Sequence, residues 1–292
     1  MLSILIPVYN YNAFTLVQEL YKQVSDCNIA FEIIVLDDHS NVSFEENNTI
    51  NKLAGCTYQI LPKNIGRSAI RNLLASKATF DHLLFIDAGT FPSHHNFIKK
   101  YLKNIHHKVV TGGMTYLPKP PEKPYKLRWV YTKKREAVIK KQNDKRPIVC
   151  SSNFLIQKEV FDKVLFDETL TKYGCEDVVF FDTIIQKGFT INYIENPVIH
   201  DANDDTDTFI TKTEYAIENL IQLINKNKLT PDRYKVSRLY YLLRKIHLDK
   251  LVKWVFLTFK GSLTRNLKSS NPSILCYDFY RLGYFCFIKN KK

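Results

Sequence analysis

Carboxylate side chains follow two apolar runs in the first third of the chain. Asp37 and Asp38 end the run FEIIVLDD, and Asp87 ends the run HLLFID. In an open parallel sheet, ligands collect beyond the carboxyl ends of the strands, so acids at neighbouring strand ends meet at one edge. These three acids together predict a ligand site, although Asp37 and Asp38 taken alone also suit a helix cap and a turn.

Basic side chains lie close to the same strand ends. The segment NIGRSAIRN indicates the start of a helix that carries Arg67 and Arg71, with Asn64 just before it. A helix N-terminus attracts anions, so this segment predicts a seat for a diphosphate. No G-x-G-x-x-G follows the first strand and no G-x-x-x-x-G-K-[ST] occurs, which argues against dinucleotide and P-loop sites. Arg71 taken alone is equally compatible with a solvated helix charge.

A second group of polar residues lies much later in the chain. Glu176 and Asp177 follow Gly174 in a predicted turn and precede an apolar helix, and His200 ends the run INYIENPVIH. Taken singly, these residues suit an acidic first helical turn and a strand-end histidine. Their functional interpretation depends on the family resemblance given below.

The elements that must position these residues alternate along the first 113 residues. Apolar runs predict strands over 2–8, 31–38, 57–61, 82–87 and 108–113. Helical spacing predicts helices over 13–24, 64–78 and 94–105, with a further helix opened by the S-x-x-E capping box at 43–46. Near-continuous apolar strands between amphipathic helices predict an α/β fold whose mostly parallel sheet is covered by helices on both faces.

Composition limits the class of protein. The 292 residues suffice for one large domain, or for a domain with an appendage. Six scattered cysteines without a C-x-x-C pair predict reduced thiols in a cytosolic protein. The N-terminus lacks the basic region and cleavage site of a signal peptide, and no stretch reaches the about 18 apolar residues of a spanning helix. We therefore expect a soluble or peripheral protein.

The net charge of +13 belongs entirely to the C-terminal segment. Residues 226–292 hold 16 Lys and Arg against three acids, whereas residues 1–225 hold equal numbers of each sign. The segment also has Leu239, Leu242, Leu243 and Ile246 at helical spacing and is rich in aromatic residues. It suits an ordinary helical appendage, a surface that meets anionic lipid, or a nucleic-acid-binding segment.

Residues 117–147 break the regular pattern. LPKPPEKPYK is interrupted by prolines, and YTKKREAVIKKQNDKR is polar and basic. We expect a mobile basic insertion or an acceptor-side loop here, in which YTKKREAVIKKQNDKR forms a polar, basic helix or a mobile loop. The predicted organisation is then a domain over 1–225, containing this insertion, and a basic amphipathic helical segment over 226–292.

Together the motifs resemble family 2 glycosyltransferases of the GT-A fold. SILIPVYN, EIIVLDDHS, NIGRSAIRN, LLFIDAG, SSNFLIQKEVF, FDETLTKYGCED and NPVIHD occur in the order and spacing of that family. The resemblance covers residues 2 to about 220 and is nearest to bacterial members that build surface polysaccharides. It implies a nucleotide-diphospho-sugar transferase domain of Rossmann-like architecture with a basic helical C-terminal appendage.

The resemblance also implies roles for individual residues. The nucleoside, usually uridine, and the diphosphate would be bound by Pro7, Tyr9, Asn10, Asp37, Asp38, Asn64, Arg67 and Arg71. Asp87 would be the first acid of the D-x-D motif that binds Mn²⁺ or Mg²⁺, and His200 would complete the metal shell. Asp177, paired with Glu176, would be the general base for the acceptor hydroxyl.

Two positions depart from the family pattern. Gly89 replaces the second acid of D-x-D, and His39 replaces a common glycine. Asp87, His200 and the diphosphate could still hold a metal, because Mg²⁺ is often bound by one or two carboxylates with phosphate oxygens. Alternatively, Arg67 or Arg71 would offset the leaving-group charge, or the protein would bind nucleotide without catalysis.

We therefore expect an inverting transferase that moves a hexosyl or N-acetylhexosaminyl group from a UDP-sugar. The acceptor would be a glycan or lipid-linked hydroxyl in surface polysaccharide synthesis at the inner face of the cell membrane. Contact with anionic lipid through 226–292 is expected, and no nucleic acid is expected. A catalytically impaired nucleotide-sugar-binding subunit and a basic membrane or nucleic-acid adaptor are the alternatives.

Overall fold

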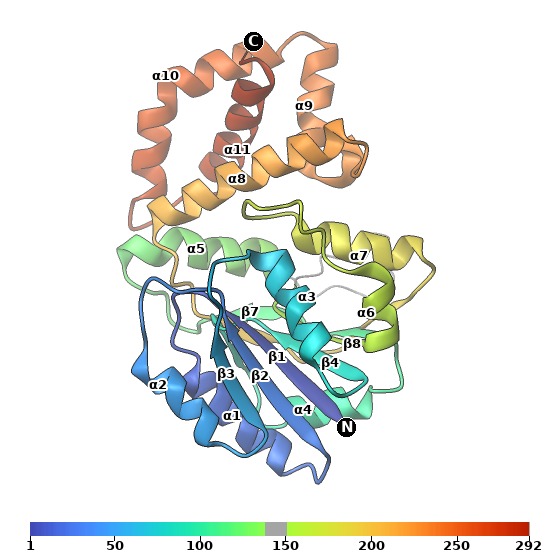
Figure 1. Cartoon of the computed structure of the whole chain (residues 1–292). Helices are drawn as coiled ribbons and strands as arrows, with labels where there is room; N and C mark the ends of the chain where they lie inside the picture. The colour runs from blue at the N-terminus through green and yellow to red at the C-terminus, as the bar shows by residue number, and fades with distance from the viewer. Residues whose placement is uncertain (138–150, 292) are drawn as a thin grey trace. The chain divides into compact units, whose positions relative to one another are not determined.

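The computed structural model describes residues 1–137 and 151–291 (Figure 1). The chain divides into two compact units. The sheet unit comprises Met1–Leu117, Arg135–Thr171 and Glu176–Asp201, and the helical unit comprises Pro118–Lys134, Lys172–Cys175 and Ala202–Lys292. The boundary predicted at residue 225 falls at the end of α8 (Thr206–Asn225), which belongs to the helical unit.

Within the described residues, a seven-stranded sheet forms the centre of the sheet unit, in the order β3-β2-β1-β4-β8-β6-β9. Its strands are β1 (Leu2–Val8), β2 (Phe31–Asp37), β3 (Cys56–Ile60), β4 (His82–Ile86), β6 (Val109–Thr111), β8 (Asn153–Gln157) and β9 (Ile191–Tyr193). The strand β8 runs antiparallel to β4 and β6, and the other pairs are parallel. The prediction of a mostly parallel α/β sheet is confirmed.

Helices cover both faces of this sheet (Figure 1). They are α1 (Phe14–Ser25), α3 (Arg67–Lys77), α4 (Phe97–Lys103), α6 (Lys158–Val164) and α7 (Glu176–Gln186). Ile4 and Ile6 of β1 pack in the cluster that includes α1 and α4, whereas Leu5 packs in the cluster that includes α3, α6 and α7. Successive strand residues point to opposite faces, so a strand covered on both sides must be apolar throughout.

A smaller sheet of short strands, in the order β5-β10-β7, also lies in the sheet unit. Its strands are β5 (Thr90–Pro92), β7 (Met114–Tyr116) and β10 (Val198–His200). The strand β10 runs antiparallel to β5, and the register pairs His200 with Thr90. This pairing brings the late histidine next to the loop that follows Asp87.

Two local predictions need correction. The helix α2 (Glu45–Asn48) begins after Phe44 without a side-chain cap, and η1 (Thr49–Lys52) follows it, so the capping box at 43–46 does not form. The predicted helix over 64–78 begins only at Arg67. The predicted insertion contains η2 (Lys123–Tyr125), α5 (Lys126–Tyr131) and η3 (Thr132–Glu136), so residues 123–136 are helical, which is one of the two forms expected for its basic part; residues 138–147 of that insertion lie outside the described residues.

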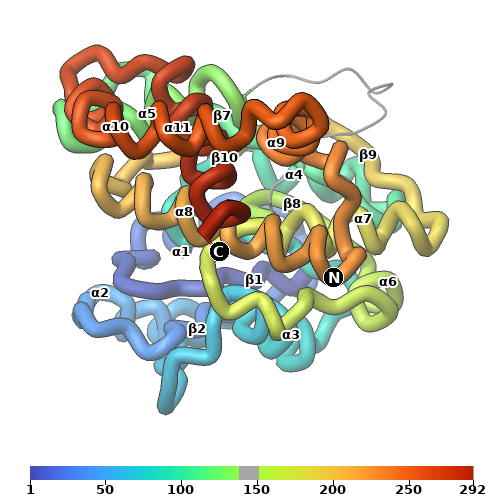
Figure 2. The backbone as a smooth tube through the Cα atoms, turned by 90° about the horizontal axis from the view of Figure 1, so that it is seen from above, coloured from blue at the N-terminus to red at the C-terminus, as the bar shows by residue number. Residues whose placement is uncertain are grey.

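In the helical unit, α8 is followed by η4 (Pro231–Arg233), α9 (Lys235–Lys245), α10 (Asp249–Leu267) and α11 (Ile274–Lys289). The helix α11 lies between α9 and α10 (Figure 1 and Figure 2). Tyrosines of α11 bind α8: the Tyr280 hydroxyl donates to Glu214 at 2.6 Å, and the Tyr284 hydroxyl donates to Glu218 at 2.7 Å. The basic tail therefore packs on α8 through partly buried hydrogen bonds.

The same helix α8 holds the loop Lys172–Cys175. The Asn219 side-chain amide donates to the carbonyl of Lys172 at 3.0 Å and to that of Gly174 at 2.9 Å. Gly174 has φ +97°, and a Cβ there would lie 2.6 Å from the Ala216 Cβ, so glycine is required on both grounds. This loop directly precedes Glu176.

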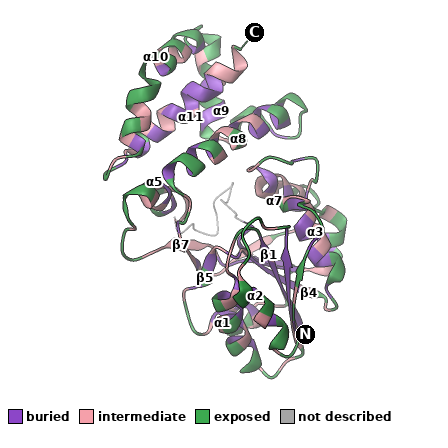
Figure 3. Cartoon of the chain, turned by 60° about the vertical axis from the view of Figure 1, so that its left-hand side comes forward, coloured by how far each residue is buried: buried purple, intermediate pink, exposed green. Residues whose placement is uncertain are grey.

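The helices α9 and α10 expose large apolar side chains, whereas α11 is mostly buried (Figure 3). The exposed apolar residues of α10 and the turn before it are Leu248, Leu251, Trp254, Leu257 and Phe259, and those of α9 and its end are Leu239, Leu242 and Ile246. Across residues 1–137 and 151–291, no helix combines the length and apolar character needed to cross a membrane.

Candidate functional site

The carboxylate of Asp37 accepts two hydrogen bonds within the sheet unit. Its Oδ1 accepts from the Ser40 amide at 2.7 Å, and its Oδ2 accepts from the Tyr58 hydroxyl at 2.8 Å. Burial raises the pKa of Tyr58 to about 12, and the hydrogen bond to Asp37 adds to the rise. Tyr58 therefore stays a hydrogen-bond donor, and Asp37 is held rigidly at the end of β2.

Asp38 fixes the turn that leads into α3. Its Oδ1 accepts from the Ile65 amide at 2.7 Å and its Oδ2 from the Gly66 amide at 2.9 Å. The Asn64 side chain donates to the Asp38 carbonyl at 3.0 Å. Gly66 has φ +88°, a conformation that favours glycine. The contacts give Asp38 a positioning role in the loop that carries Asn64.

Asn10 positions the loop after β2. Its side-chain oxygen accepts from the amides of Asn41 and Val42, at 2.8 and 3.2 Å. Tyr9 is exposed, and its hydroxyl accepts from the Asn41 side chain. Pro7, within β1, is half-buried. After the first strand, the Tyr9 ring is therefore exposed to solvent, and the Asn10 side chain is hydrogen-bonded to the loop after β2.

The unusual residue His39 has a local explanation. Its φ of +60° lies in the left-handed region that favours glycine, and its Nδ1 lies 3.1 Å from the Leu61 carbonyl. A ring hydrogen bond thus offsets part of the backbone strain at this position.

Arg71 and Asp87 form an ion pair at the end of β4. Arg71 Nη2 donates to Asp87 Oδ1 at 2.6 Å, and Nη1 donates to the Arg67 carbonyl at 3.1 Å. The Arg71 side chain is 2% exposed and Asp87 is 27% exposed. The guanidinium also lies 5.5 Å from the centre of the Phe166 ring. Arg71 is a buried cation with one partly exposed carboxylate partner, so the alternative of a solvated helix charge does not hold.

Three buried polar atoms near the starts of α3 and α7 have no hydrogen-bond partner among the described residues. They are Ser68 Oγ, Arg71 Nε and Glu176 Oε2. Buried polar groups are normally satisfied, so unpaired ones mark a place for water or a bound ligand. Two can donate, which suits an anion beside the N-terminus of α3.

Arg67 connects the α3 N-terminus to the acidic pair of α7. Its Nη1 lies 3.2 Å from Glu176 Oε1; Arg67 is half exposed and Glu176 is buried. The pKa of the neighbouring Asp177 is raised to about 7, chiefly by burial and also by the Glu176 charge, while the Val178 amide and both arginines oppose the rise. Part of the Asp177 surface is open to solvent. A carboxylate with a pKa near neutrality suits a general base.

His200 lies on the small sheet next to another acid. Its Nδ1 is 3.7 Å from Asp201 Oδ1, and the Tyr11 hydroxyl donates to Asp201 Oδ2. The Asp201 amide donates to the Gly89 carbonyl at 3.3 Å. Both the Asp87 and Asp201 side chains are partly exposed. The loop after β4 and the end of β10 thus bring two carboxylates and an imidazole into one region of the sheet unit.

The Asp87, Asp201 and His200 side chains are ligand types that bind a hard divalent ion, but they do not form a complete coordination set. Carboxylate oxygens suit Mg²⁺ and Mn²⁺, and an imidazole suits Mn²⁺ better than Mg²⁺. Within the described residues, no three His, Cys, Asp or Glu side chains converge closely enough to hold a metal. A metal here would therefore need oxygen ligands from a bound diphosphate.

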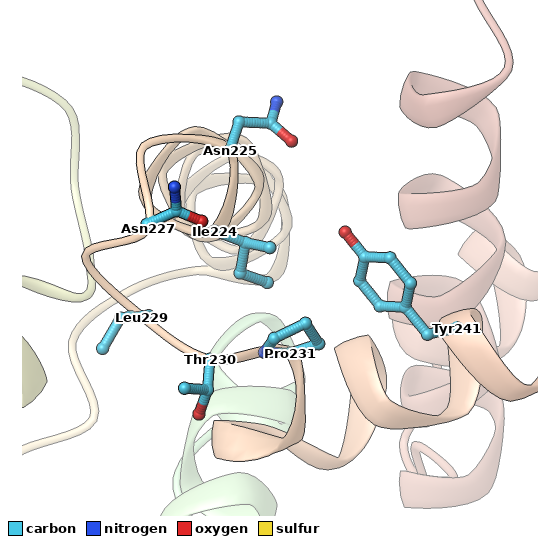
Figure 4. Close-up of a pocket in the computed structure, with 7 residues that line it drawn as sticks. All are labelled: Ile224, Asn225, Asn227, Leu229, Thr230, Pro231 and Tyr241. Carbon is cyan, nitrogen blue, oxygen red and sulfur yellow. The ribbon is translucent and has the colours of Figure 1, made fainter.

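Two hollows occur in different units. A hollow of about 150 Å³ lies at the N-terminus of α3, lined by Asn64, Ile65, Gly66, Ser68, Ala69, Glu168, Leu170 and Thr171. A larger one of about 430 Å³ lies in the helical unit (Figure 4). Its lining contains Asn225, Asn227, Thr230 and Tyr241 but no charged side chain, so it offers no obvious catalytic group.

The structure therefore connects one group of the residues selected from sequence. The chain of contacts runs from Asp87 through Arg71 and Arg67 to Glu176, with Asp177 beside it. Sequence reasoning missed Ser68, Phe166 and Asp201. Asp201 was visible as the residue after His200 in NPVIHD, but only the folded chain shows what it faces.

Comparison with known proteins identifies relatives of this arrangement. A family model described as glycosyl transferase family 2 matches residues 3–165. Poly(ribitol-phosphate) beta-N-acetylglucosaminyltransferase TarP of Staphylococcus aureus (strain N315) is 23% identical over 246 residues, which cover 80% of this chain and 68% of TarP.

Solved structures share the fold at low sequence identity. The mannosyltransferase PcManGT from Pyrobaculum calidifontis, in complex with GDP-Man and Mn²⁺, matches with a TM-score of 0.57 and 15% identity over 99% of this chain and 86% of its own. S. aureus TarS 1-349 in complex with UDP matches with a TM-score of 0.50 and 15% identity, covering 100% of this chain and 92% of that one. A longer TarS chain is covered over only 40% of its length.

Proposed function

The chain belongs to glycosyl transferase family 2 and has the GT-A fold, and from this premise we propose an inverting transfer of a sugar from a UDP-sugar. The proposed acceptor is a hydroxyl of a glycan or of a lipid-linked intermediate in surface polysaccharide synthesis. The proposed location is cytoplasmic, at the inner face of the cell membrane. The observation that carries the proposal is the environment of Asp177.

Asp177 is proposed as the general base. Its pKa of about 7 lets it exist as a carboxylate near neutrality and still hold a proton well. It would take the proton from the acceptor hydroxyl, whose oxygen forms the new bond to the anomeric carbon. The bond from that carbon to the diphosphate breaks, and the electron pair leaves with the nucleotide. Attack opposite the leaving group inverts the anomeric centre.

Glu176, Arg67 and Arg71 are proposed to set the pKa of Asp177, and the two arginines to offset the negative charge of the leaving diphosphate. Glu176 raises the pKa of Asp177, while Arg67 and Arg71 lower it. The unpaired donors Ser68 Oγ and Arg71 Nε lie in the first turns of α3, where the helix dipole favours a diphosphate. This grouping supports leaving-group binding by Asn64, Arg67 and Arg71.

A divalent metal, Mn²⁺ or Mg²⁺, is proposed to bind at Asp87 and His200 together with the diphosphate. When bound, it would supply a Lewis acid that offsets the charge of the leaving group. Arg71 holds the Asp87 carboxylate in one orientation at 2.6 Å, leaving its other oxygen available. The nucleoside is proposed to meet Pro7, the exposed Tyr9 ring and Asn10, beside Asp37 and Asp38.

The relatives favour a particular donor class. TarP is described as an N-acetylglucosaminyltransferase of poly(ribitol-phosphate), and TarS has been solved with UDP. We therefore place UDP-N-acetylhexosamine first and UDP-hexose second. Residues 113–150 are proposed as the acceptor side, of which residues 138–150 lie outside the described part of the chain.

The deciding experiment separates binding from chemistry. Asp177→Asn should lower the rate of UDP release from UDP-GlcNAc by about a thousandfold or more, in the range of general-base losses, while calorimetry finds UDP affinity within about twofold. The exposed Asp162→Asn on α6 is the matched control and should keep full activity. Loss of UDP binding in Asp177→Asn would contradict the role as base.

Calorimetry of UDP with and without Mn²⁺, repeated on Asp87→Ala, tests the metal. The proposal requires metal-dependent binding that is lost in Asp87→Ala. A protein that binds UDP but neither transfers nor hydrolyses any UDP-sugar would be the impaired subunit instead. Salt-sensitive binding to lipid or nucleic acid without UDP binding would indicate an adaptor.

We also propose peripheral contact with an anionic membrane through residues 226–292. The supporting observation is that Leu251, Trp254 and Leu257 of α10 are about half exposed, next to the exposed cations Lys250 and Lys260. Apolar side chains flanked by lysines are typical of helices that lie in a lipid interface. The charge of the segment complements anionic headgroups.

A further inference from the structure

The position of Gly89, just before β5, is open toward the carboxylate of Asp201, the residue that follows β10. A Cβ built on Gly89 would lie 3.5 Å from Asp201 Oδ1 and 3.7 Å from Oδ2. No other heavy atom outside the neighbouring residues comes nearer to that Cβ position. The Asp201 carboxylate therefore lies beside the point from which a side chain at position 89 would start.

Backbone pairing holds Asp201 at this position. The strands β5 and β10 pair His200 with Thr90, and the Asp201 amide donates to the Gly89 carbonyl at 3.3 Å. The Thr90 amide and hydroxyl in turn donate to the Asp87 carbonyl at 3.1 and 2.7 Å. Asp87 and Asp201 are thus linked through a short series of backbone hydrogen bonds.

The Asp201 side chain is also oriented by a neighbour. The Tyr11 hydroxyl donates to Oδ2, and the carboxylate remains 29% exposed. Oδ1 lies 3.7 Å from His200 Nδ1, a distance too long for a direct hydrogen bond. The side chain is therefore positioned and partly open to solvent, as a ligand group must be.

We propose that Asp201 supplies the second carboxylate for the divalent cation and diphosphate, in place of the side chain that Gly89 lacks. This inference rests on the proposed function, because it assigns a residue to the same metal-bound diphosphate. It explains why glycine occupies position 89: an acid there would put a second negative charge against Asp201, and like charges at such distances disfavour joint ionisation. A single carboxylate, carried by either residue 89 or residue 201, is therefore enough at this place.

If Asp201 replaces the missing acid, a carboxylate at position 89 should substitute for the one at position 201. Asp201→Ala should weaken Mn²⁺-dependent UDP binding at least about tenfold, the loss expected when a metal site loses a supporting carboxylate. The double variant Gly89→Asp with Asp201→Ala should recover affinity to within about threefold of the original protein, because it returns one carboxylate to the same place. Gly89→Asp alone should not improve affinity.

Calorimetric titration of UDP, with and without Mn²⁺, measures these affinities, and circular dichroism checks that each variant is folded. Asp204→Ala is the matched control, since Asp204 pairs with Lys212 at 2.5 Å in the helical unit. Equal Mn²⁺-dependent affinity in Asp201→Ala and the original protein would overturn the inference and leave the proposed function intact. A folded double variant that fails to recover would overturn it too, whereas no UDP binding by the original protein would overturn both.

Discussion

The site of the sheet unit and the exposed surface of α9 and α10 handle charge in opposite ways. In the sheet unit, Arg71 pairs with Asp87 and Arg67 with Glu176, so each cation lies against an acid. On α9 and α10, exposed cations such as Arg244, Lys245 and Lys250 lie among exposed leucines, and the segment carries the whole net charge of the chain. One region neutralises its charges internally, and the other presents them outward.

This difference predicts which substitutions damage the folded protein and which damage only its interactions. Removing a charge from the sheet-unit site leaves a partner behind in a poorly solvated place. Removing an exposed side chain from α10 leaves little unsatisfied, because that face already meets solvent. The four predictions below test this contrast, from the largest expected effect to the smallest.

Arg71→Ala should lower the free energy of unfolding by about 3 kcal/mol, because it leaves Asp87 without its cation and opens a cavity beside Phe166. Lys108→Ala is the matched control; Lys108 and its partner Glu159 are both about half exposed, so the loss should stay below about 1 kcal/mol. Urea unfolding at neutral pH measures both. Equal losses would show that burial does not separate the two ion pairs.

Substitution of Leu251, Trp254 and Leu257 together by Ser should weaken binding to phosphatidylglycerol vesicles about 30-fold, since about 2 kcal/mol of apolar burial is lost. Co-sedimentation measures this, with phosphatidylcholine vesicles and high salt expected to abolish binding. UDP release in solution should be unchanged. Leu275→Ser, on the exposed side of α11, is the control for general loss of apolar surface. Unchanged binding by the triple variant would remove α10 from the membrane contact.

The activity should fall about tenfold per pH unit below pH 7, because the protonated Asp177 cannot accept the acceptor proton. A pKa raised in the folded state also means that Asp177 favours folding below about pH 4 and loses that contribution as the pH rises through 7. Asp177→Asn should remove this part of the pH dependence of stability. Rate profiles and urea unfolding from pH 5 to 8 measure both effects, and a flat profile across pH 7 would contradict the assignment.

Asp38→Asn should have the smallest effect, a loss of about 1 kcal/mol, because an amide keeps one acceptor oxygen and loses the second backbone hydrogen bond. Hydrogen exchange at the Ile65 and Gly66 amides should then quicken about fivefold. Exchange at Ser40, which is bound by Asp37 instead, is the internal control. No change at residues 65 and 66 would show that the turn is held by other contacts.

The sequence predicted the parts of the fold that depend on local pattern. The strands β1 to β4 follow from apolar runs, because a strand buried on both faces must be apolar, and α1 follows from its helical spacing. The start of α3 was missed, since the turn at residues 64–66 is held by Asp38 from a distant strand. In the tail, the helical spacing of Leu239, Leu242 and Leu243 falls in α9 (Lys235–Lys245), whereas Ile246 lies just after its end.

The site was predicted to the extent that its residues belong to motifs. Asp87, Arg71 and Asp177 stood out from their types and positions, and the fold connects them. Their roles in binding and catalysis remain predictions. Asp201 could not be found in this way, because what matters is its distance from Gly89, and that distance depends on the pairing of β5 with β10.

The hydrogen bonds of Asn219 bear on how far this chain can be shortened. Removal of everything after residue 225 keeps α8, so the carbonyls of Lys172 and Gly174 retain their donor. Removal of everything after residue 201 deletes Asn219, so the loop Lys172–Cys175 loses these hydrogen bonds. That loop directly precedes the acidic pair of α7. A minimal catalytic fragment must therefore include a helix that contributes no group to the chemistry itself.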